Sequence, residues 1–187
     1  MRRLQQLLFI VCLLFLCWLA MMAVHELGHV LGALFTNGSV TKVVLHPLSI
    51  SRTDVLPNPH PAVVVWLGPI VGAVLPLLIS YLPLGDPTIE RLSRFFAGFC
   101  LVANGAYIAV GSFDGVGDCG EMLRTGTPMW LMLAFGGVAI PVGFYVWHRM
   151  GSASDFFSDP SLVTKKMLAT TIAVLAVVVV LELLLSR

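Results

Sequence analysis

Long apolar runs separated by short polar segments dominate the chain, and five of them are long enough to cross a membrane as helices. The predicted spans cover residues 4–35, 61–82, 92–112, 129–147 and 167–185. At about 1.5 Å per residue the first run exceeds a hydrocarbon core of about 30 Å, so its last turns should project from the core or the helix should tilt. The pattern predicts an all-α membrane protein with about five transmembrane helices.

The segment between the first two spans has a different pattern. Residues 40–45 and 49–52 are rich in β-branched side chains, and His46-Pro47 lies between them. We expect a small β-hairpin or a re-entrant strand after the first helix, although an interfacial coil fits the same residues.

Composition supports a membrane location. Of the 187 residues, 58% are hydrophobic and 11% are charged, whereas soluble domains carry about 25% charged residues. The expected surroundings are therefore a lipid bilayer, and the net charge of +1 gives no reason to expect nucleic acid. Residues 1–187 are predicted to form one polytopic domain, with a core at about 4–127 and accessory helices at about 128–187.

The N-terminal apolar run follows Met1-Arg2-Arg3, as a signal peptide would. It is longer than a usual signal peptide core and has no clear small-x-small cleavage site, so it is interpreted as a retained anchor.

Lysine and arginine positions predict the orientation. Seven lie on the side of the N-terminus, and four lie on the other: Arg2, Arg3, Arg91, Arg94, Arg149, Lys165 and Lys166 against Lys42, Arg52, Arg124 and Arg187. This asymmetry favours a multi-pass protein with a cytoplasmic N-terminus.

The first span contains the motif His25-Glu26-Leu27-Gly28-His29. A spacing of four residues on a helix brings both histidines to one face, where their imidazoles can bind one zinc ion. Glu26 can reach a zinc-bound water and accept its proton while the water attacks a carbonyl. Gly28 would leave a gap for the backbone of a neighbouring helix.

The surroundings of this motif make it specific. Ionisable side chains within an apolar span are costly and usually functional, whereas the structural alternative is an interhelical hydrogen-bonded cluster. The sequence tracks the soluble metzincin pattern from His25 to Gly32, but Phe35 stands where that pattern needs a third histidine. A soluble zinc protease of that class is therefore excluded.

A catalytic zinc needs a third protein ligand. Two further spans return the chain to the same face of the membrane at residues 113–121, which hold its densest acidic cluster. Asp114, in Phe113-Asp114-Gly115, and Asp118 are the two candidates.

Together these motifs resemble the site-2 protease family of intramembrane zinc metalloproteases, in particular its small, minimal members. That family follows its H-E-x-x-H helix with N-x-x-P-x-x-x-L-D-G, in which the aspartate is the third ligand. Asn104 opens a comparable stretch here, but Tyr107 stands at the proline position. We favour Asp118 over Asp114, because a ligand at the start of a helix is better fixed than one inside a glycine-rich loop.

Other polar residues are weaker candidates. The resemblance implies that Asn104 binds substrate backbone or the zinc water, and an interhelical hydrogen bond explains it equally well. Cys119, His46 and His60 are alternative third ligands. Glu182, near the end of the last span, is expected to reach the interface with its carboxylate.

The expected function is an intramembrane zinc metalloprotease with one Zn²⁺ per chain, in which Glu26 activates the zinc-bound water. Its expected substrate is a membrane-spanning protein that unwinds locally and pairs with an edge strand near residues 40–45. The alternative is a non-proteolytic membrane protein with a structural or transport metal site. An interaction protein with a relic motif would bind no metal.

Overall fold

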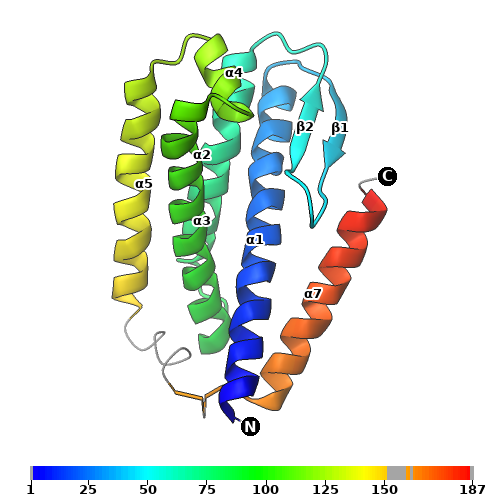
Figure 1. Ribbon diagram of the computed structural model, residues 1–187, viewed down its shortest axis with the longest axis vertical. Helices are drawn as coiled ribbons and strands as arrows, with labels where there is room; N and C mark the ends of the chain where they lie inside the picture. Colours follow the sequence, from blue (N-terminus) through cyan, green and yellow to red (C-terminus); the bar gives the residue numbers. More distant parts are fainter. Residues whose placement is uncertain (1, 151–158, 161, 186–187) are drawn as a thin grey trace.

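The computed structural model describes residues 2–150, 159–160 and 162–185 (Figure 1). These residues form six α-helices and one two-stranded antiparallel sheet. Five helices are long and apolar enough to cross a membrane: α1 (Arg2–Phe35), α2 (Pro61–Ile79), α3 (Pro87–Asp114), α5 (Met129–Arg149) and α7 (Lys165–Leu185). The predicted fold class, with five helical spans and a small hairpin after the first, is confirmed.

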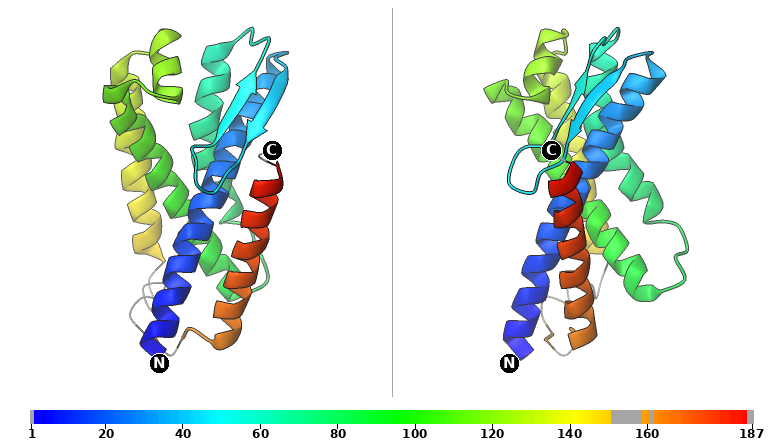
Figure 2. Two further views of the ribbon diagram at one scale, coloured as in Figure 1. Left: turned by 45° about the vertical axis from the view of Figure 1, so that its right-hand side comes forward. Right: turned by 90° about the vertical axis from the view of Figure 1, so that its right-hand side faces the viewer.

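The helices form a bundle in which α1 packs on α2, α2 packs on α3, and α3 packs on α5, while α7 lies on the other side of α1 (Figures 1 and 2). The N-terminus and the start of α7 lie at one end of the bundle (Figure 1). The short helix α4 (Asp118–Arg124) lies at the opposite end, beside the start of α2 (Figure 1). With 34 residues, α1 is about 50 Å long, well beyond the thickness of a hydrocarbon core.

Two helix boundaries differ from the sequence prediction by three residues or more. α2 ends at Ile79 instead of residue 82, and α3 begins at Pro87 instead of residue 92. The α3 start follows from Asp86, whose carboxylate accepts hydrogen bonds from the backbone N–H groups of Thr88 and Ile89 at 2.7 and 3.1 Å. An aspartate N-cap followed by proline is a strong helix start, and it outweighs the polar character of the first turn.

The hairpin consists of β1 (Val40–Val44) and β2 (Arg52–Val55). The prediction for its second strand, residues 49–52, was wrong except at Arg52, because the backbone of residues 46–49 turns there. The Leu48 N–H donates to Nδ1 of His46 at 3.1 Å, which stabilises that turn. The loop between the two strands extends along the bundle toward the C-terminal end of α7 (Figures 1 and 2).

Apolar side chains packed under α4 fix this short helix on the bundle. Cys119 and Met122 of α4 are fully buried against Val65 of α2 and Ile108 of α3. The chain reaches α4 through a turn with Gly117 at φ 61°, a conformation that favours glycine. The first residue of α4, Asp118, is thereby held at the end of the bundle.

The helices α1 and α2 approach closely because glycines face each other across their contact. A Cβ on Gly28 would overlap the carbonyl oxygen of Leu67 and the Cα of Gly68. A Cβ on Gly32 would lie 2.9 Å from the Cα of Val64. The expectation that Gly28 makes room for a neighbouring backbone is confirmed.

The last span carries a buried acid. Glu182 is 5% exposed, and its Oε2 atom has no hydrogen-bond partner among the described residues. Glu182 follows Val178 and Val179, which pack beside Leu19 of α1, on the same side of α7, so protein covers its side chain. That its carboxylate reaches the membrane interface stays a prediction. Arg187, which entered the orientation argument, lies outside the described residues.

The tight α1–α2 contact yields a stability prediction. Gly28→Ala should lower folding stability by about 1–3 kcal/mol or more, because the methyl group meets backbone atoms that cannot rotate away. Thermal unfolding in detergent measures the effect. Gly137→Ala in α5 is the matched control, since no atom lies within 4 Å of its added Cβ. Equal melting temperatures for the two variants would contradict this account of the contact.

Candidate metal centre

Three possible metal-binding atoms converge where α1, α2 and α4 meet. Nε2 of His25 lies 2.8 Å from Oδ2 of Asp118, and Nε2 of His29 lies 3.3 Å from the same oxygen. The two Nε2 atoms are 3.1 Å apart. His25 and His29 are buried within α1. Among the described residues, these three form the group of His, Cys, Asp or Glu side chains close enough to hold one metal ion.

The other ring nitrogen of His29 is paired with the backbone. Its Nδ1 lies 2.9 Å from the carbonyl oxygen of Val64 in α2. A carbonyl oxygen only accepts hydrogen bonds, so Nδ1 carries the proton. With its proton on Nδ1, a neutral His29 imidazole presents the lone pair of Nε2 toward His25 and Asp118.

Asn104 fixes His25 in the same way. Its Nδ2 donates to the carbonyl oxygen of Cys100 at 2.9 Å, which leaves Oδ1 facing Nδ1 of His25 at 2.7 Å. An amide oxygen is an acceptor, so Nδ1 of His25 carries the proton and Nε2 offers its lone pair. Asn104 is 1% exposed. The geometry thus supports the interhelical hydrogen bond as its role, with both polar groups of its side chain occupied inside the protein.

Asp118 completes the cluster from the first turn of α4. Its backbone N–H donates to the hydroxyl of Tyr107 in α3 at 3.2 Å. Burial would raise the pKa of the Asp118 carboxyl, but the contacts with His25 and His29 outweigh burial and hold that pKa well below its usual range. Asp118 is therefore ionised at neutral pH and supplies a negative charge at the cluster.

This arrangement fits a divalent metal ion. Two imidazole lone pairs and a carboxylate oxygen at such short separations repel each other unless a proton or a cation lies between them. In a tetrahedral zinc site with bonds of about 2.0–2.1 Å, ligand atoms lie about 3.3–3.4 Å apart. The observed separations of 2.8–3.3 Å are slightly shorter and need little adjustment. Three donors of types that zinc accepts leave a fourth position for water or substrate.

Glu26 lies next to this cluster without belonging to it. It is 3% exposed, and its Oε2 accepts a hydrogen bond from the hydroxyl of Thr53 at 2.7 Å. Thr53 belongs to β2, where it pairs with Val43 of β1. The hairpin therefore holds the carboxylate of the motif. Thr53 could not be identified from the sequence, since nothing in its β-branched segment distinguishes it from its neighbours.

The other sequence candidates lie away from the three donors. Asp114 is the last residue of α3 and is exposed, so its expected place inside a loop was wrong. Nδ1 of His46 accepts from Leu48, and His60 is exposed before α2. Burial, together with the charge of Asp118, raises the pKa of the Cys119 thiol to about 11, and its sulfur contacts backbone oxygens of α3.

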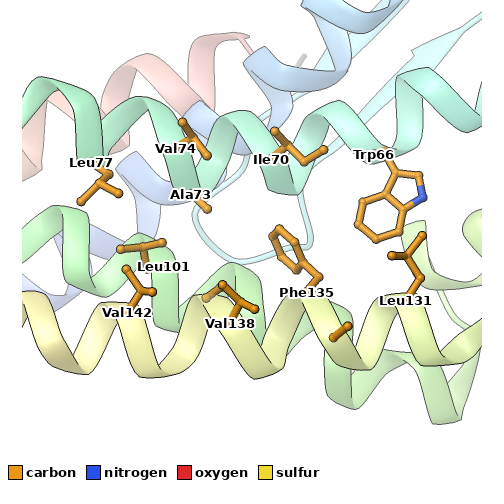
Figure 3. A pocket seen from close by; sticks show the side chains of 12 residues that line it. Trp66, Ile70, Ala73, Val74, Leu77, Leu101, Leu131, Phe135, Val138 and Val142 are labelled. Atoms are coloured by element: carbon orange, nitrogen blue, oxygen red, sulfur yellow. The ribbon is translucent and has the colours of Figure 1, made fainter.

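A separate apolar cavity of about 690 Å³ lies between α2, α3 and α5 (Figure 3). Trp66, Ile70 and Leu77 line it from α2, with Leu101 of α3 and Phe135 of α5 among the facing residues. These α2 positions lie on the side of the helix away from Gly68, which faces the histidines. The cavity therefore contributes no polar group to the metal centre.

Comparison of the chain with family models, with curated proteins and with solved structures found no match. The fold and the site together define a multi-span helical membrane protein with a possible His/His/Asp metal site.

The convergence at Asp118 predicts different outcomes for the two aspartates. Asp118→Ala should weaken zinc binding by more than about 100-fold, beyond the 10–100-fold loss typical of residues that only orient ligands. Asp114→Ala should leave zinc content unchanged, because its side chain is exposed at the end of α3.

Metal analysis of detergent-purified protein at graded free zinc measures both variants. His25→Ala serves as the reference for loss of a ligand. Full zinc content in Asp118→Ala, or its loss in Asp114→Ala, would contradict the assignment.

Proposed function

We propose that the protein is an intramembrane zinc metalloprotease whose metal is held by His25, His29 and Asp118 and whose general base is Glu26. The observation that carries this proposal is the placement of Glu26. Its buried carboxylate lies beside the donor cluster, takes no part in it, and is fixed by Thr53 at 2.7 Å. A catalytic site needs such a free base, whereas a ligand set alone would not.

Each residue has a defined part in peptide hydrolysis. A zinc ion in this site would lower the pKa of its water toward about 7 and polarise the substrate carbonyl. Glu26 would accept the proton of the attacking water and pass it to the leaving amine, so that the carbon–nitrogen bond breaks with proton balance. Asn104 and the Val64 carbonyl would keep both imidazoles in the tautomer that presents Nε2.

The proposed substrate is a membrane-spanning protein that unwinds locally, because the hydrogen bonds of an intact helix shield its peptide bonds. β2 is the strand that carries Thr53 beside α1, and β1 lies on its outer side (Figure 1). Among the described residues no further strand pairs with β1. An unwound segment could add to this edge by backbone hydrogen bonds.

The alternative, a structural or transport metal site without proteolysis, accounts for less of the geometry. A structural zinc site closes all four coordination positions with protein ligands. Here three donors converge, and the adjacent carboxylate is held by a hydroxyl instead of joining them. The resemblance of H-E-L-G-H to the site-2 protease family also supports the protease. We propose further that the N-terminus is cytoplasmic, on the distribution of lysine and arginine.

Glu26→Gln tests the general base. The amide keeps the size and the hydrogen bond from Thr53 but cannot take up a proton, so cleavage of a model membrane-spanning substrate should fall at least about 100-fold. Zinc content should match the parent protein, because Glu26 is not a ligand. Parent-level cleavage by this variant, with zinc bound, would refute the role of Glu26.

Thr53→Val tests the support of the base. Valine preserves the branched shape but removes the hydroxyl, so we expect kcat to fall about tenfold, on the scale of losing an orienting partner. Zinc affinity should not change. Thr53→Ser is the matched control and should recover most of the activity, because it restores the donor. If Thr53→Val and Thr53→Ser cleave equally well, the hydrogen bond to Glu26 has no catalytic importance.

A further inference from the structure

Tyr107 touches two residues of the metal centre from α3. Its ring meets the ring of His25 edge-on, with centroids 5.8 Å apart. Its hydroxyl accepts the hydrogen bond from the backbone N–H of Asp118 at 3.2 Å. Tyr107 follows Asn104 by three residues, so both project from one face of α3 toward α1. The phenol is thus held beside both a histidine and the aspartate of the cluster.

The hydroxyl proton of Tyr107 is not used within the described part of the protein. A phenol can accept and donate at once. The bond from Asp118 occupies an acceptor position, and no described residue accepts a hydrogen bond from the phenol. The side chain is 39% exposed, so a bound molecule can reach it. The structure therefore presents a fixed, unused O–H donor at the edge of the metal centre.

Peptide hydrolysis needs such a donor. When water attacks, the carbonyl π electrons move onto oxygen, and a hydrogen bond to that oxygen lowers the barrier. Asn104 is poorly placed to supply it, because its side chain is 1% exposed, one of its two amide N–H groups donates to Cys100, and its oxygen accepts from His25. Glu26, as the base, cannot donate during the attack. Among the described residues, Tyr107 is the remaining polar side chain that contacts both a histidine and the aspartate of the cluster.

We propose that Tyr107 is a further catalytic residue, whose O–H stabilises the oxyanion formed during peptide hydrolysis. This inference rests on the proposed protease function. In the step, a bond forms between the water oxygen and the carbonyl carbon, and the water proton passes to Glu26. The carbonyl oxygen takes the negative charge and accepts a hydrogen bond from Tyr107, which keeps its proton. The carbon–nitrogen bond then breaks, and the proton on Glu26 goes to the amine.

A purely structural role for Tyr107 makes a different prediction. Its hydroxyl also anchors the first N–H of α4, so its loss could misplace Asp118. That defect would weaken zinc binding and disappear when zinc is in excess. Loss of an oxyanion donor would persist at saturating zinc and would weaken binding of a tetrahedral mimic.

The experiment compares Tyr107→Phe with Tyr145→Phe, a control at an exposed tyrosine of α5. At saturating zinc, Tyr107→Phe should lower kcat by about 10²–10³-fold with little change in KM, the usual cost of one oxyanion donor. A phosphinic peptide, which mimics the tetrahedral state, should bind much more weakly to it in a thermal-shift titration. Tyr145→Phe should match the parent protein in both measurements.

A second variant protects the test against a folding defect. 4-Aminophenylalanine at position 107 restores an N–H donor on the same ring but is a poor acceptor for the Asp118 N–H. It should recover at least part of both kcat and phosphinate affinity lost in Tyr107→Phe, whereas a structural role predicts no recovery.

The outcomes separate the two proposals. If the parent protein loaded with zinc does not cleave, the protease proposal fails and the role of Tyr107 fails with it. If the parent protein cleaves, three results overturn the role of Tyr107 alone. These are parent-level kcat in Tyr107→Phe, recovery of its kcat by added zinc, and phosphinate binding equal to that of the parent protein.

Discussion

The close approach of α1 and α2 is the constraint on which the site depends. With a side chain at Gly28, the backbone of Leu67 and Gly68 could not lie against α1. A Cβ on Gly68 would in turn occupy the space filled by the rings of His25 and His29. The contact also brings the Val64 carbonyl to Nδ1 of His29. Small residues thus do two things here: they let membrane helices touch, and they leave room for two imidazoles between them.

Hydrogen bonds of the two histidine Nδ1 atoms determine that the Nε2 atoms face the centre of the cluster. The Val64 carbonyl and the Asn104 amide oxygen accept hydrogen bonds from the Nδ1–H groups of His29 and His25, so the Nε2 atoms of both rings face the Asp118 carboxylate. In an apolar bundle, three electron-rich atoms at this spacing are unfavourable without a positive partner. Two of these atoms belong to histidines in α1, a helix that is otherwise largely apolar. A cation or a shared proton between these atoms would relieve their repulsion.

The polar residues around the candidate metal centre come from helices and strands that differ in how extensively they pack on the rest of the protein. α1, α2 and α3 form the packed bundle that fixes the histidines and Asn104, and α4 is held by buried Cys119 and Met122. The hairpin, by contrast, lies along α1 and reaches the centre through Thr53. The last span, α7, packs mainly on α1. Rigid elements therefore carry the donors, while the peripheral ones approach Glu26 and the outer face of α1.

The sequence by itself determined the class of fold and the place of His25 and His29 on one face of the first helix. An apolar run long enough to span a membrane must form its backbone hydrogen bonds internally, and a helix does so. A spacing of four residues on a helix places both imidazoles on one face. Because each span carries the chain across the membrane, the third donor was expected in the segment that returns to the same face, residues 113–121. The sequence could not choose between Asp114 and Asp118 within that segment. That choice was decided by packing, since α3 extends to Asp114 and turns its side chain outward, while α4 docks and brings Asp118 inward. The contacts of Thr53, Val64 and Tyr107 were likewise decided by tertiary structure alone, because they join residues far apart in the chain, and no local pattern encodes which distant atoms will meet.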